Sequence, residues 1–184
     1  MSSRNPWRSV NDPHVMGSGL FVNGAVVESG TKRHMQMITA TLLTAATSAT
    51  VILIHFEVMT LMSKLANRVH WPVRVRLLVG VFTLFAAHSL EVWVFAGALY
   101  FGNEVLLLGS FDGPFDGSAR DYLYISLVNY TTLGYGEIVP TGLLRTICGF
   151  EALIGLLMMA RSAAFTVFRP DLSLARGAGV EDMA

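Results

Sequence analysis

Three long apolar stretches alternate with polar segments along the chain. The hydrocarbon core of a bilayer is about 30 Å thick, and about 20 helical residues are needed to cross it. The stretches 37–62, 77–101 and 143–168 are long enough and contain few charges. We therefore predict an all-α membrane protein with three transmembrane helices.

Polar segments flank these stretches. Residues 1–34 are polar and contain glycine, and they lack an apolar run long enough for a cleavable signal peptide. We expect this segment to be a flexible N-terminal tail. Residues 169–184 are expected to form a short cytoplasmic tail, too small to fold as a ligand-sensing domain. The membrane domain is predicted to cover residues 35–168.

A shorter helix is predicted between the second and third stretches. Turn residues end the preceding loop, at Gly113, Pro114 and Gly117. Ser118, with Asp121 three positions later, is typical of a capping box. A helix from Ala119 to about Thr131 would be roughly 19 Å long at ~1.5 Å per residue, which is too short to cross a bilayer. It is therefore expected to enter the membrane and return to the same side.

The distribution of charge predicts the orientation. The connection after the second stretch is acidic, whereas the loop after the first stretch carries the basic residues Lys64, Arg68, Arg74 and Arg76. Basic loops of membrane proteins tend to stay in the cytoplasm. We therefore expect a multi-pass protein of the cell membrane with its N-terminus outside and its C-terminus in the cytoplasm. Lys32 and Arg33, just before the first stretch, argue for the opposite orientation.

Composition narrows the class of function. The chain is 53% hydrophobic and only 14% charged, and its 13 basic residues balance its 13 acidic residues. A neutral chain offers no basic surface for nucleic acid. No nucleophile constellation, phosphate-binding loop or zinc-ligand spacing points to an enzyme. We expect a protein that acts within the lipid bilayer and needs no cofactor.

The segment TTLGYGEIVP, residues 131–140, follows the predicted short helix. Non-helical backbone at membrane depth occurs only where it is buried in protein or lines a water-filled path. Gly134 and Gly136 adopt left-handed conformations at little steric cost, which lets successive carbonyls point toward one axis. The ordinary alternative is a glycine-rich extracellular turn. The capped helix before the segment and the apolar stretch after it argue against that alternative.

With these flanks, the segment resembles the selectivity filter of pore-loop potassium channels, whose carbonyl oxygens replace the water shell of the ion. Their usual sequence is T-V-G-Y-G, so leucine replaces valine here. One chain supplies a quarter of each carbonyl ring, so the resemblance implies a homotetramer. The implied filter consists of Thr132, Leu133, Gly134, Tyr135 and Gly136. The carbonyls of the first four of these residues would hold K⁺.

The same resemblance assigns the larger elements. It implies an outer helix over 77–101, a pore helix and filter over 119–136, and an inner helix over 143–168. The additional helix over 37–62 makes the chain similar to small bacterial three-span proteins with an ion channel domain. Many family members carry tryptophans on the pore helix where this chain has Tyr124 and Ile125. The contacts around the filter tyrosine are therefore expected to differ.

Three single residues receive roles from the resemblance. Glu137 would lie at the outer mouth, where an acid raises the local cation concentration and hydrogen-bonds behind the filter; the alternative is an ordinary solvated loop carboxylate. Gly155 falls where inner helices bend, so it is either a hinge or a close-packing residue. Arg161 would repel cations if it faced the inner cavity, and otherwise it points toward lipid headgroups or acidic partners.

Ionisable residues within the apolar stretches are candidates for function. His55, His88 and Glu91 lie at depths where they would meet. They form either a hydrogen-bonded network between the first two helices or a metal or haem site. Glu151 would lie behind the pore helix and anchor it, with Asn129 or a tyrosine as partner.

We predict passive, potassium-selective conduction, with K⁺ as the permeant ion. No apolar stretch carries arginine at every third position, so we expect no voltage sensor. One alternative is a weakly selective cation channel. Another is an intramembrane metal or haem protein that uses His55, His88 and Glu91.

Overall fold

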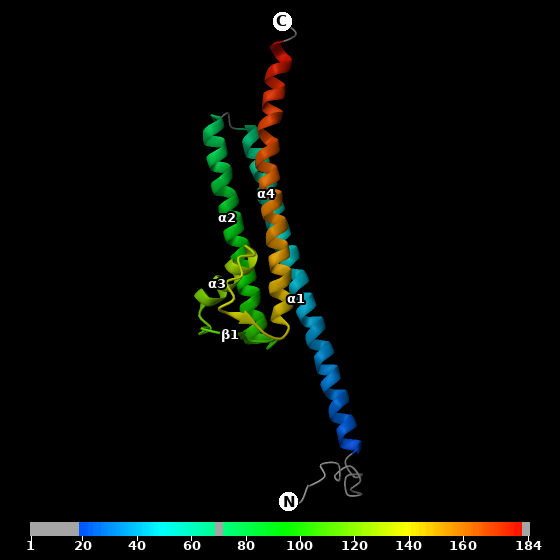
Figure 1. The fold of residues 1–184 in the computed structure, drawn as a ribbon. Helices are drawn as coiled ribbons and strands as arrows, with labels where there is room; N and C mark the ends of the chain where they lie inside the picture. Colours follow the sequence, from blue (N-terminus) through cyan, green and yellow to red (C-terminus); the bar gives the residue numbers. More distant parts are fainter. Residues whose placement is uncertain (1–18, 69–71, 182–184) are drawn as a thin grey trace, which may run out of the picture. The chain divides into compact units, whose positions relative to one another are not determined.

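The computed structural model describes residues 19–68 and 72–181. The chain divides into two compact units, residues 1–38 and residues 39–184. The helices of the chain are α1 (Gly19–Arg68), α2 (Val73–Tyr100), α3 (Ala119–Tyr130) and α4 (Leu144–Glu181) (Figure 1). A π-helical turn, η2 (Phe101–Val105), continues α2, and the two short strands are β1 (Phe111–Asp112) and β2 (Val139–Pro140).

Three helices are long and apolar enough to cross a membrane, which confirms the predicted all-α membrane fold. By length and composition the candidate spans are Gly30–Leu65, Arg74–Val105 and Leu144–Thr166. At most a third of each apolar window is buried within the chain, so most of its apolar side chains face outward. Lipid or neighbouring protein is the environment in which such exposed apolar surface is stable.

Two of the described helices extend past the predicted membrane domain. Helix α1 begins at Gly19, within the segment expected to be a flexible tail, and α4 continues to Glu181, within the expected C-terminal tail. Hydropathy marks the part of a helix that matches the bilayer, whereas helical hydrogen bonds run from backbone to backbone and continue past it. Residues 1–18 and 182–184 lie outside the described residues.

Two clusters of buried side chains hold α3 between α2 and α4. The outer cluster gathers around Phe111, Tyr122 and Leu144, next to the paired strands. The inner cluster gathers around Phe95 and Tyr130, and it includes side chains of α1 and α4. The C-terminal end of α3 is therefore packed against the long helices.

Helix α3 begins where the sequence predicted. Ser118 is its N-cap, and the Ser118 hydroxyl accepts a hydrogen bond from the Asp121 amide at 3.3 Å. The reciprocal bond of a capping box is absent from the described contacts, because the Asp121 carboxylate instead accepts from the Asp116 amide at 2.8 Å. The helix ends at Tyr130, one residue before the predicted end.

Candidate functional site: a loop of free carbonyls and a buried polar cluster

The loop after α3 has an alternating backbone. Thr132, Gly134 and Gly136 have φ angles of 58°, 57° and 79°, whereas Leu133 and Tyr135 are not in the positive region. A left-handed threonine is a true outlier, because its branched side chain makes this conformation costly. Such strain is typical of functional sites that the surrounding structure over-determines.

The amide groups of this loop are turned toward α3. The Thr132 amide donates to the Asn129 carbonyl at 2.9 Å, and the Leu133 amide donates to the Val128 carbonyl at 2.9 Å. The Gly134 amide lies 3.4 Å from the same Val128 carbonyl. Within the described part of the chain, no backbone hydrogen bond ends on the carbonyls of residues 132–135. Four consecutive carbonyl oxygens are thus left available to an external ligand.

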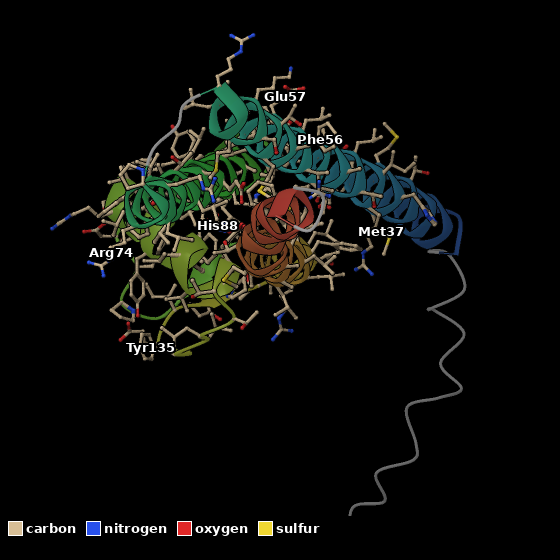
Figure 2. All side chains as sticks on the ribbon, turned by 90° about the horizontal axis from the view of Figure 1, so that it is seen from above. Met37, Phe56, Glu57, Arg74, His88 and Tyr135 are labelled. Atoms are coloured by element: carbon tan, nitrogen blue, oxygen red, sulfur yellow. The ribbon has the colours of Figure 1, made fainter. Side chains whose placement is uncertain are left out.

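The side chains of the loop are uncovered in a single chain. Leu133 is 56% exposed and Tyr135 is 68% exposed. Figure 2 shows Tyr135 and Phe56 on opposite sides of the helices, with α4 between them. The loop therefore lies on the face of the molecule that α1 does not cover.

Hydrogen bonds fix the C-terminal end of the loop. The Tyr124 hydroxyl donates to the Glu137 carboxylate, and this bond raises the pKa of Tyr124 to about 12. The Thr141 amide donates to the Ser110 carbonyl at 2.8 Å. A Cβ at Gly113 would collide with the Glu137 carbonyl, so only glycine permits this close approach. Tyr124 thus supplies a polar contact behind the loop.

The family model described as Ion channel matches residues 74–168 of the 184 residues. This chain belongs to the ion channel family. The matched range contains α2, α3, the carbonyl loop and the membrane-length part of α4, whereas α1 precedes it. The candidate spans and the family together make this ion channel a multi-pass membrane protein. No curated protein and no solved structure matches the chain.

Gly155 of the channel lies against the last residue of α3. A Cβ at Gly155 would collide with the Tyr130 carbonyl oxygen and would lie 3.0 Å from the Tyr130 ring. The structure therefore gives Gly155 a close-packing contact. A larger residue there would push against the backbone from which the carbonyl loop starts.

A buried polar cluster joins all four helices of the channel. His55 is 1% exposed and Glu91 is 0% exposed, and the His55 Nδ1 lies 2.8 Å from the Glu91 Oε1. The His88 Nδ1 lies 3.2 Å from the Glu91 Oε2, to which the Tyr130 hydroxyl also donates. The Ser162 hydroxyl lies 3.0 Å from the His88 Nε2 and 3.4 Å from the His55 Nε2. The three residues expected to meet therefore do meet.

Glu151 is buried behind α3. The Ser126 hydroxyl donates to the Val92 carbonyl at 2.8 Å, and the same oxygen is hydrogen-bonded to the Glu151 Oε1. The hydrogen-bond partner of Glu151 is thus Ser126 rather than a tyrosine, and the expected partner Asn129 lies beside the same carboxyl group. Among the described residues, the Glu151 Oε2 and the Asn129 Nδ2 have no hydrogen-bond partner. Ser126 ties the middle of α3 to both α2 and α4.

Arg161 faces α1. Its guanidinium carbon lies 5.6 Å from the centre of the Phe56 ring, which is within the range of a cation–π contact. Phe56 and the carbonyl loop are on opposite sides of the helices (Figure 2). The guanidinium is therefore placed away from the loop.

Two members of the polar cluster, Tyr130 and Ser162, were not predicted from the sequence. The position of Tyr130 at the end of the predicted short helix was a usable signal, since a tyrosine there has one apolar face and one hydroxyl that needs a partner. Ser162 gave no such signal. Serine is common in membrane helices as a packing residue, and only the rotation of α4 brings its hydroxyl to the histidines.

Proposed function

We propose that this ion channel conducts potassium selectively and passively through a homotetrameric pore. The observation that carries the proposal is the loop at 132–136, where the amides of its first three residues turn toward α3 and four carbonyls remain free. Carbonyl oxygens arranged in rings replace the water shell of a dehydrated cation. A passive pore of this kind needs no catalytic residue.

The potassium sites would be formed by the carbonyls of Thr132, Leu133, Gly134 and Tyr135. The alternation of φ at Thr132, Gly134 and Gly136 supports this assignment, because it turns successive peptide planes so that their oxygens share one side. The end of α3 lies directly before the loop, and the partial negative charge of a helix C-terminus favours a cation there.

Four copies are required because one chain supplies one side of each ring. The exposure of Leu133 and Tyr135 supports such an assembly, since neighbouring copies would cover these side chains. Because the Arg161 guanidinium faces α1, four arginines need not crowd the pore. The acid at the outer mouth, Glu137, would be held in place by Tyr124.

The proposed channel lies in the cell membrane with its N-terminus outside and its C-terminus in the cytoplasm. The basic loop between α1 and α2 supports this orientation. Tagged termini, probed for access to protease in sealed cells, would test it. Protection of the N-terminus would reverse the assignment.

Potassium flux from liposomes containing the purified protein tests the function. Sodium-loaded liposomes and a Gly134→Ala variant would be measured in parallel. Gly134 is left-handed, and a Cβ added there would meet no atom within 4 Å, so alanine perturbs only the backbone conformation. We expect selective flux in the wild type and its loss in this variant.

The matched control is Gly97→Ala. A Cβ at Gly97 would also meet no atom within 4 Å, and this glycine lies within α2, outside the carbonyl loop. This control should conduct as the wild type does. Equal flux of potassium and sodium in the wild type would instead indicate a weakly selective cation channel. Retained selectivity in Gly134→Ala would refute the filter assignment.

A further inference from the structure

The buried polar cluster contains a set of metal-ligating atoms that ion conduction does not use. His55, His88 and Glu91 each offer one ligand atom, and these atoms all lie within 4.8 Å of one another. Glu91 and His55 are almost fully buried, whereas the His88 side chain is 20% exposed in the single chain. Among the described residues, no lysine or arginine forms an ion pair with Glu91.

The spacing of these atoms is close to that of a tetrahedral site. Bonds of about 2.0–2.1 Å place the ligand atoms of a tetrahedral ion about 3.3 Å apart. The Nδ1 atoms of His55 and His88 lie 2.8 Å and 3.2 Å from the two Glu91 oxygens. The Tyr130 hydroxyl lies 2.9 Å from the His88 Nδ1 and completes a fourth corner. The three ligand atoms lie within 4.8 Å of one another, so the side chains must draw together to form a coordination shell.

The number of donors and acceptors in the polar cluster also favours a bound cation. Without one, Glu91 accepts from both Nδ1–H groups, and the two Nε2 lone pairs are left to share the single hydroxyl proton of Ser162. With an ion on both Nδ1 atoms, each Nε2 carries a proton, and the two lone pairs of the Ser162 oxygen accept both. Ser162 then orients the two imidazoles as an outer-shell partner.

We propose that His55, His88 and Glu91 bind one divalent transition-metal ion, with Tyr130 or water as the fourth ligand. Two imidazoles and a carboxylate suit borderline ions such as Zn²⁺ and Co²⁺. The rings lie only 5.3 Å apart, which favours a single small ion over a haem. The ion fastens α1 to α2, next to the residue that ends α3.

Cobalt binding to the full-length protein tests this proposal. The protein would be purified with an affinity tag that lacks histidine, stripped with chelator, and titrated with Co²⁺ in detergent near neutral pH. We expect about one Co²⁺ per chain, with the intense visible absorption of a tetrahedral ion, and its displacement by Zn²⁺. If the wild-type protein binds neither ion, the proposal is wrong. The cluster would then be a hydrogen-bonded network in which the side chains share protons.

Variants locate the ion. His55→Gln should abolish the visible absorption, whereas His34→Gln, at an exposed position of α1, should leave it unchanged. Ser162→Ala removes only the outer-shell partner, so it should weaken Co²⁺ affinity about 10- to 100-fold without abolishing binding. Undiminished Co²⁺ absorption in His55→Gln would place the metal elsewhere. Because these readouts do not depend on flux, they are independent of the potassium proposal.

Discussion

Gly155→Ala tests whether α3 rests directly on α4. The added methyl would collide with the Tyr130 carbonyl oxygen, and backbone cannot move aside as a flexible side chain can. Inserting one methyl into a well-packed contact costs about 1–3 kcal/mol. The same change also gains about 1 kcal/mol of helix propensity, because glycine is a poor helix former.

A matched variant separates these two effects. Gly149 lies in the same helix, and a Cβ there would meet no atom within 4 Å. Gly149→Ala has the same propensity gain without the collision, so the two variants should differ in free energy of unfolding by about 1–3 kcal/mol per chain. Thermal unfolding of the purified protein measures this difference.

Flux provides the second assay for this pair. The collision in Gly155→Ala displaces the residue that precedes the carbonyl loop, so its ratio of potassium to sodium flux should fall. Gly149→Ala should retain the wild-type ratio. Equal stability and equal flux ratios in the two variants would refute the close contact between α3 and α4.

Three further substitutions follow from individual contacts. Ser126→Ala removes the hydroxyl that is hydrogen-bonded to both the buried Glu151 carboxyl group and the Val92 carbonyl, so it should lower stability by about 1–3 kcal/mol in thermal unfolding. Ser89→Ala, at a half-buried position of α2 where the hydroxyl donates to the Phe85 carbonyl of the same helix, should change stability little, and equal effects would contradict the anchor. Tyr124→Phe removes the donor to Glu137. The protein should still fold, but bilayer recordings should show a less stable conducting state. Unaltered recordings would show that this hydrogen bond does not contribute to conduction. Arg161→Ala should leave single-channel current unchanged because the guanidinium lies over Phe56, and a raised current would place it in the pore.

Local features of the sequence predicted the elements of the channel well. The spans follow from apolar length, and the start of α3 follows from Ser118, whose cap depends on residues only three positions away. The alternation of the loop follows from Gly134 and Gly136, but the left-handed Thr132 does not, because a branched residue disfavours that conformation. The Thr132 amide donates to the Asn129 carbonyl in this conformation, a contact that the residue type does not predict.

Contacts between helices were less predictable because they depend on how each helix is rotated about its axis. His55, His88 and Glu91 were correctly placed together, but their partners Tyr130 and Ser162 come from helices far along the chain. The direction of Arg161 was open for the same reason. A side chain in an apolar helix faces lipid, pore or neighbour according to packing, and hydropathy does not distinguish these environments.

The full lengths of α1 and α4 do not follow from apolar length. Apolar length identified where α1 and α4 match a bilayer, but both helices extend beyond that part at Gly19 and Glu181. Polar side chains do not interrupt backbone hydrogen bonding, so a change in polarity does not mark the end of a helix.

The central claim is that the carbonyls of residues 132–135 select potassium. The reversal potential of the purified channel in a planar bilayer, with potassium on one side and sodium on the other, tests it most directly. For the wild type we expect a reversal potential far from zero, with the sign that potassium permeation sets. For Gly134→Ala we expect this selectivity to be lost. A wild-type reversal potential near zero in a conducting tetramer would contradict it.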